Sequence, residues 1–212
     1  MNKFILTLAI TLSVLSFSFS QTNSGKLVYR MSVEGPSDTL IDAESSNRLT
    51  TIYFLGDLVR TETEGRLGKQ VLIQNLKTNI GHLLLNLGPQ KLAIEIDYNK
   101  DSSTTKNPYK IKYKCGSDTL AGKKAKKAIV QRYGKELDLL YMKKTNAKYA
   151  PAYNDAKGIP LRYKLVVDTY TEVYTCKELT FKAVDAKKFD IPQEYIRLTM
   201  EEFLEGIQSG NQ

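Results

Sequence analysis

The sequence is poor in the side chains on which most metal sites and most histidine-based catalysis depend. It has one histidine, two cysteines and no tryptophan in 212 residues. A zinc site needs three or four nitrogen, sulfur or oxygen ligands, and His82 with the distant Cys115 and Cys176 does not supply them. A Gly-x-Ser-x-Gly elbow and a Gly-rich loop with P-loop spacing are also missing. These absences predict a protein that is not an enzyme and holds no metal or cofactor.

Long hydrophobic runs are absent as well, so the sequence predicts no transmembrane segment. Hydrophobic residues make up 42% and charged residues 25% of the chain, which is ordinary for a folded protein and excludes disorder as its main state. The formal net charge is +8, and the sequence pI is about 9.3. The aromatic residues are mostly tyrosines, 13 against seven phenylalanines, and tyrosine suits half-buried strands.

Residues 1–20 have the order of a secretory signal peptide. Lys3 is their only charge, residues 4–14 form a short apolar run, and small residues precede Gln21. The run is shorter than the roughly 20 residues of a spanning helix. The sequence therefore predicts a signal peptide at 1–20 and one β-rich domain at 21–212. The product is exported, with the periplasm favoured over the extracellular space.

Most of the remaining chain alternates between apolar and polar residues with a period of two, which indicates β-strands. Gly56-Asp57 is a tight hairpin signal between two such segments. Residues 80–87 are apolar on both faces, as expected where one face of a strand meets a helix and the other lines a closed or cupped interior. The predicted strands cover residues 27–33, 51–55, 58–63, 71–76, 80–87, 92–98, 109–115, 124–132, 137–142, 161–167 and 171–184.

Only the C-terminal end has a convincing helical pattern. Thr199 and Glu202 form a capping box, and Met200, Phe203 and Ile207 belong to an apolar stripe. Many consecutive strands followed by one helix predict a mainly β protein, with an antiparallel curled sheet or half-open β-barrel and a C-terminal α-helix. A plain sandwich fits the same pattern.

Four segments resemble a secreted, uncharacterised envelope family, a domain of unknown function similar to the periplasmic lipoprotein carriers of the Lol type. Residues 51–62 resemble its early strand, Gly-Asp turn and Val-Arg strand, and residues 119–128 resemble its Ile-Ala-Gly-Tyr-Lys segment. Residues 158–161 resemble its Gly-Leu-Pro-Leu strand start, and residues 189–199 its closing Phe-x-Ile-Pro-x-x-Tyr and Met-Thr. The resemblance spans about residues 26–205.

The resemblance implies a half-open antiparallel barrel around a hydrophobic cavity. Carriers of this kind hold the acyl chains of lipoproteins under a helical lid. Here residues 26–195 show little helical periodicity, and the candidate lid segments, 42–47 and 146–157, are short. The resemblance therefore carries over the architecture and an apolar cavity, but not acyl-chain transport.

The leading hypothesis is a protein that binds an apolar ligand or lipid in a cupped sheet, without catalysis. Its alternative is an envelope structural or protein-interaction module with a solid core and no ligand. Alternation alone selects the candidate cavity residues, so a one-residue slip would invert any strand. They are Leu27, Tyr29, Met31, Phe54, Leu84, Leu92, Ile94, Ile96, Ile111, Tyr113, Leu139, Leu165 and Phe181.

The two cysteines are a candidate disulfide, because the chain is directed to an oxidising compartment. Alternation places Cys115 on the same face as Tyr113, and Cys176 on the face opposite Val173. A bulge would be needed to bring the two thiols together, so the sequence leaves their pairing open. His82, between Ile80 and Leu84 on an apolar stripe, is interpreted as a packed or wall histidine.

A basic run lies in the middle of the chain, with Asp118 as its one acid. Lysines that alternate with apolar residues indicate a solvated strand face. The alternative is attraction to the anionic head groups of a membrane surface. Nucleic acid is excluded as a partner of an exported chain, and no protein partner is specified. The candidate anionic-surface residues are Lys110, Lys112, Lys114, Lys123, Lys124, Lys126 and Lys127.

Overall fold

The structure, a computed structural model, describes residues 23–35, 48–65, 68–100, 109–167 and 170–209. The predicted signal peptide and the candidate lid segment 42–47 lie outside these residues. Among the described residues, no helix is long and apolar enough to cross a membrane.

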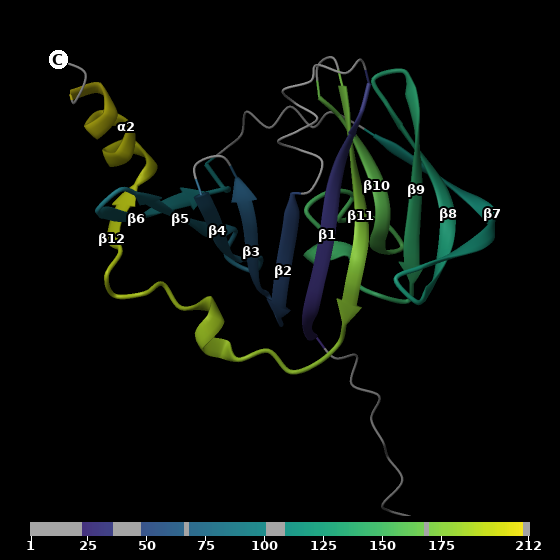
Figure 1. Cartoon of the computed structure of the whole chain (residues 1–212), viewed down its shortest axis with the longest axis horizontal. Helices are drawn as coiled ribbons and strands as arrows, with labels where there is room; N and C mark the ends of the chain where they lie inside the picture. The colour runs from purple at the N-terminus through teal and green to yellow at the C-terminus, as the bar shows by residue number, and fades with distance from the viewer. Residues whose placement is uncertain (1–22, 36–47, 66–67, 101–108, 168–169, 210–212) are drawn as a thin grey trace, which may run out of the picture.

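The described chain forms one large sheet of 12 strands, followed by a C-terminal helix (Figure 1). The strands are β1 (Ser24–Glu34), β2 (Leu49–Leu55), β3 (Leu58–Gly65), β4 (Gly68–Asn75), β5 (Ile80–Leu87), β6 (Gln90–Asp97), β7 (Lys110–Leu120), β8 (Lys123–Arg132), β9 (Lys135–Lys143), β10 (Gly158–Val167), β11 (Tyr170–Thr180) and β12 (Ile196–Thr199). Two 3-10 turns, η1 (Ala147–Tyr149) and η2 (Ala186–Phe189), and the helix α2 (Met200–Ser209) complete it. The predicted fold class, a mainly β open curled sheet with a C-terminal helix, is confirmed.

The strand order is β12-β6-β5-β4-β3-β2-β1-β11-β10-β9-β8-β7. Two consecutive meanders, one from β1 to β6 and one from β7 to β11, are joined where β1 pairs with β11. That pairing aligns Leu27 with Leu179. Because strand pairing over such a sequence distance leaves no local signal, the alternation pattern predicts the strands but not this junction.

The sheet has two parts that differ in curvature (Figure 1). We call the curled part, β1, β2 and β7–β11, the bowl, and the flatter part, β3–β6 and β12, the wing. The chain between β11 and β12, residues 181–195 with η2, crosses one side of the wing; we call it the strap. The helix α2 follows β12 at the outer edge of the wing, and none of its residues is buried.

Each part has its own hydrophobic core. The bowl core is formed mainly by buried side chains from β1, β2, β8–β11 and the segment around η1, with Val59 of β3, and Tyr29, Phe54 and Tyr163 are among its largest members. The strap core is smaller and lies on the other side of the sheet, where Phe189 packs over Val71 and Leu84. The strap thus covers an apolar wing face that would otherwise be exposed to water.

The C-terminal part of the chain departs most from the sequence prediction. The last long strand ends at Thr180 rather than at residue 184, because its partner β1 begins at Ser24 and offers no pairing beyond Lys26–Thr180. The strand β12 was not predicted, and it pairs with β6 in parallel, unlike every other neighbouring pair in the described sheet. The predicted capping box is confirmed: Glu202 N–H donates to Thr199 Oγ1 over 3.1 Å, and Thr199 N–H to Glu202 Oε2 over 2.7 Å.

Candidate functional site

Aromatic side chains fill the centre of the bowl. The ring of Tyr163 is stacked on Tyr174, with 4.9 Å between centroids, and meets the edge of Tyr153 at 5.9 Å. Phe54 is stacked on Tyr149 at 4.2 Å. Burial raises the pKa of Tyr153, Tyr163 and Tyr174, so all three remain neutral phenols. These rings, among them Tyr149 and Tyr153 of the loop between β9 and β10, belong to one packed cluster inside the bowl.

The segment 146–157, one of the two candidate lid segments, closes the bowl from inside. We call it the lid loop. Tyr149 donates its hydroxyl to the carbonyl oxygen of Gly56 over 2.9 Å, and Tyr153 donates to that of Lys164 over 2.7 Å. Lys148 Nζ lies 2.7 Å from Asp57 Oδ1, and this contact lowers the pKa of Asp57. The lid loop is therefore fastened to the β2–β3 turn and to β10.

The predicted cavity residues divide into several groups in the structure. Most of those on the bowl strands are buried in the bowl core or pack against it: Leu27, Tyr29, Phe54, Leu139, Ile111, Leu165 and Phe181. Met31 is also buried, further along the same face of β1. Tyr113 is 36% exposed and meets the edge of Tyr141. On the wing, Leu92, Ile94 and Ile96 share one face of β6.

Leu84 lies on the opposite side of the sheet from the other predicted wing residues. It pairs with Ala93 and Val71 and belongs to the strap core. Leu92 and Ile94 flank Ala93 on β6 and therefore face away from the strap. Since β5 is apolar on both faces, alternation could not decide which leucine faced which side. Only the position of the strap decides it.

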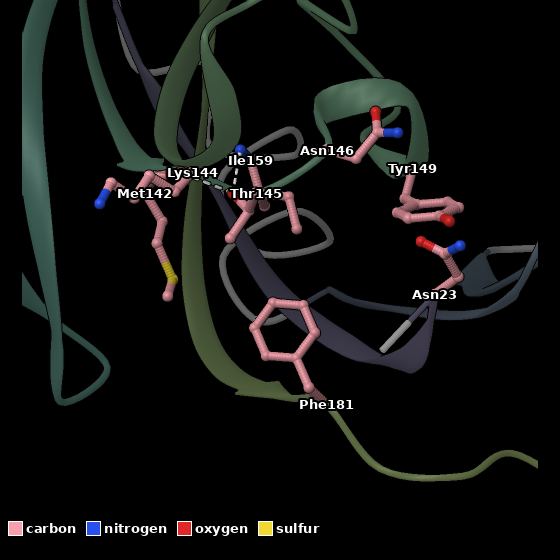
Figure 2. A pocket seen from close by; sticks show the side chains of 8 residues that line it. All are labelled: Asn23, Met142, Lys144, Thr145, Asn146, Tyr149, Ile159 and Phe181. Atoms are coloured by element: carbon pink, nitrogen blue, oxygen red, sulfur yellow. Dashed lines mark hydrogen bonds between the residues drawn. The ribbon is translucent and has the colours of Figure 1, made fainter. Parts of the chain in front are cut away.

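A small apolar pocket opens at the end of the bowl where β1 begins (Figure 2). We call it the mouth pocket; its volume is about 230 Å³. In Figure 2, Phe181 and Tyr149 stand on two sides of the opening, and Met142 lies on a third. The lining residues are Asn23, Met142, Lys144, Thr145, Asn146, Tyr149, Ile159 and Phe181. Sequence reasoning selected only Phe181 among them.

The walls of the mouth pocket are held by packing and hydrogen bonds. Thr145 donates its hydroxyl to the Met142 carbonyl over 2.5 Å and accepts the Ile159 N–H over 2.8 Å. Gly158 makes this junction between β9 and β10 feasible, because any Cβ there would collide with the Met142 carbonyl. The pocket is thus a preformed feature of the fold. The Gly-Ile-Pro signal could have pointed to the strand start, but not to the pocket.

A second, larger opening lies between the strap and the wing, with a volume of about 880 Å³. We call it the strap groove. Its wall contains His82, whose Nε2 is 3.5 Å from Glu95 Oε2, and Arg197 of β12. Phe189 and Ile73 contribute apolar surface. This position agrees with the interpretation of His82 as a wall residue. Within the described part of the chain, no group of three or more histidine, cysteine or acidic residues is placed to hold a metal ion.

Both cysteines are free thiols in the structure. Cys115 is exposed in an irregular stretch of β7, where pairing with β8 is interrupted between Tyr113 and Ser117. Cys176 is buried in the bowl core and donates its thiol to the Glu178 carbonyl over 3.3 Å. Burial raises the pKa of Cys176 to about 11. The β11 strand does have a bulge beside Cys176. This bulge places Cys176 and Leu179 together on the face toward the bowl core, and it does not bring Cys176 to Cys115.

The seven candidate anionic-surface lysines all lie on the hairpin formed by β7 and β8. We call this the basic hairpin; its lysines are Lys110, Lys112, Lys114, Lys123, Lys124, Lys126 and Lys127. Lys123 and Lys126 are partly buried, and the other five are exposed. Because Lys110 and Lys112 alternate with Ile111, they share the face of β7 opposite the bowl core.

Comparison with known proteins supports the fold alone. The sequence matches no family model and no curated protein. This chain is similar in structure to PNGF-II, which was solved in two crystal forms. The TM-scores are 0.52 and 0.51 and the sequence identities 13% and 12%, over 87% and 88% of this chain. MucB has a TM-score of 0.45 at 15% identity, over 81% of this chain and 58% of its own. The chain spans only about a third of PNGF-II, 32% and 33% in the two forms.

Proposed function

We propose that this protein is an exported, non-catalytic interaction module that takes one apolar side chain of a protein partner into the mouth pocket. The observation that carries the proposal is the packing inside the bowl, where tyrosines and the lid loop contact the side chains of the strands. The volume of the mouth pocket, about 230 Å³, is smaller than the roughly 300–1,000 Å³ of small-molecule sites. A preformed apolar pocket of this size suits one buried anchor residue of a protein interface.

A free apolar ligand or lipid is the second candidate function. It is favoured by the apolar walls of the mouth pocket, to which Met142, Tyr149 and Phe181 contribute. An acyl chain would place its end in this pocket and the rest of its length outside the bowl. The two candidates therefore differ in what the pocket binds and in whether lipid accompanies the purified protein.

Methionine methyl NMR tests both candidates, because the exported chain has three methionines in different places. Met142 lines the mouth pocket, Met31 is buried on β1, and Met200 begins α2. We expect 4-methylphenol, which has the size of a tyrosine side chain, to shift the Met142 methyl signal and leave Met31 unchanged. We expect native mass spectrometry of the purified protein to show no bound lipid.

Asn23→Trp is designed to fill the mouth pocket, and Lys77→Trp in an exposed turn is its control. The first variant should lose the Met142 response and the second should keep it. A Met142 signal that ignores 4-methylphenol in the unmodified protein would refute the mouth pocket as an anchor site. Co-purified lipid, together with a Met142 shift on adding palmitate, would establish the second candidate instead.

A further inference from the structure

We infer that the outer edge of β7 binds an acidic, extended segment of another protein as an added β-strand. Among the strands that the structure describes, β7 is the last of the sheet, and β8 is its one neighbour in the strand order. This edge belongs to the basic hairpin and contributes no residue to the mouth pocket. The inference therefore stands apart from the proposed function and can fail without it.

The edge has the length and the exposure that strand addition requires. β7 has 11 residues, and all of them except Ile111 and Leu120 are exposed. A strand with a neighbour on one side presents unpaired N–H and C=O groups on the other, and an extended segment can satisfy both. The other end of the sheet, β12, has only four residues and offers a much shorter edge.

The positive charge of the basic hairpin favours an acidic partner segment. Within the described ranges, seven ion pairs join lysine or arginine to a carboxylate, and none of them includes a lysine of the basic hairpin. The seven lysines therefore lack the carboxylates that neutralise Lys26, Lys148 and Lys164 elsewhere. Unneutralised charge of one sign attracts a partner of the opposite sign and sets its specificity. A second copy is disfavoured, because two such edges would bring lysines of both chains together.

The spacing of the lysines defines the pattern of the added strand. Lys110 and Lys112 lie on one face of β7, and Ile111 packs against the bowl core on the other. Neighbouring residues of paired strands share a face. The added segment should therefore carry Asp or Glu at every second position and apolar residues between them. Lys110 and Lys112 precede the irregular stretch between Tyr113 and Ser117, so the acidic positions of the added strand should lie beside residues 110–113, away from Asp118.

Peptide binding measured by fluorescence polarisation tests the inference. The probe is a labelled ten-residue peptide that alternates glutamate and valine. Two further peptides carry N-methyl groups on odd or on even residues, which keeps the charge and removes one row of N–H donors. A strand pairs through one edge only, so one methylated peptide should lose at least about tenfold in affinity, or roughly 1.4 kcal/mol, and the other should bind as before.

Charge variants complete the experiment. Replacing Lys110, Lys112 and Lys114 by Glu should abolish binding of the unmodified peptide. The matched control replaces the exposed Lys77, Lys182 and Lys187 by Glu and should retain it. An unchanged methionine methyl spectrum confirms that each variant folds, and Asn23→Trp should bind the peptide normally.

Three results would overturn the inference. If both methylated peptides bind as well as the unmodified one, the peptide binds through its charge alone and does not pair with the outer edge of β7. If the peptide fails to bind at all, the edge does not accept an acidic strand. If phosphatidylglycerol vesicles bind through the same lysines while the peptide does not, the basic hairpin is a membrane-facing surface.

Discussion

The rings of Tyr29 and Tyr163 meet edge to face in the bowl core, with centroids 5.6 Å apart and planes at 77°. Both side chains are completely buried, but their hydroxyls differ. Tyr29 donates its hydroxyl to the Pro160 carbonyl over 2.5 Å, whereas the Tyr163 hydroxyl has no partner among the described residues. Variants at these two positions can therefore compare how a hydrogen-bonded buried hydroxyl and a buried hydroxyl without a partner each affect stability.

Tyr29→Phe and Tyr163→Phe should change the stability in different ways. We expect Tyr29→Phe to lower the free energy of unfolding by about 1 kcal/mol, because it removes a hydrogen bond and leaves the Pro160 carbonyl unpaired. Tyr163→Phe removes a hydroxyl with no partner and should leave stability unchanged or raise it by up to about 1 kcal/mol. Urea unfolding of the two variants measures the difference. Equal losses would mean that Tyr163 is satisfied in solution.

The two thiols should react at very different rates in the folded protein. The exposed Cys115 should react with a disulfide reagent at pH 8, while Cys176, buried and with a pKa of about 11, should not. We expect one thiol per chain to be titrated in native buffer and two in denaturant. Cys115→Ser should abolish the native signal. If no thiol is titrated in denaturant without reductant, the cysteines form a disulfide.

Glu62 should make the stability depend on acidity. Burial by itself raises the pKa of Glu62, but hydrogen bonds from Lys69 and Arg60 outweigh it and lower the pKa below the ordinary value of 4.5. Such a group stabilises the fold above pH 4.5, and this contribution is lost as the pH falls through the pKa of the folded state. We expect Glu62→Gln to cost about 1 kcal/mol at pH 7 and progressively less below pH 4.5. A cost that is the same at pH 7 and pH 3 would contradict this role.

The strap should depend on Phe189, the buried anchor of η2 over the wing. Phe189→Ala should lower the free energy of unfolding by about 3 kcal/mol, because it removes a buried ring and leaves a cavity. Lys187→Ala, on the exposed side of the same turn, is the control and should have little effect. Hydrogen exchange of the β4 and β5 amides should become faster in the first variant only. Unchanged exchange there would show that the strap does not stabilise the wing.

Local patterns in the sequence predicted much of the fold. Period-two alternation located every strand of the described residues except β12, and the Gly56-Asp57 signal placed the β2–β3 turn. The capping box at Thr199 and Glu202 placed the start of α2. These features are set by neighbouring residues, through backbone geometry and capping hydrogen bonds, and so they can be found without the tertiary structure.

The candidate site was harder to predict from the sequence than the fold. Alternation identified Leu27 and Tyr29 as inward-facing but could not tell that tyrosines of the lid loop would fill the space in front of them. Alternation also could not predict which side of the sheet Leu84 faces. When both faces of a strand are apolar, the segment that packs over one of them decides this. The mouth pocket brings together the start of β1 with the ends of β9 and β11, which are adjacent only in the folded chain.

The sequence by itself determined the β-rich class, the strand periodicity, the C-terminal helix and the concentration of lysine between residues 110 and 127. The tertiary structure decided that β1 pairs with β11, that the lid loop packs inside the bowl, and that the strap covers one side of the wing. The physical reason is the range of the interactions. Alternation and capping act between near neighbours, whereas the β1–β11 junction, the packing of the lid loop in the bowl and the strap core depend on contacts between residues far apart in the chain.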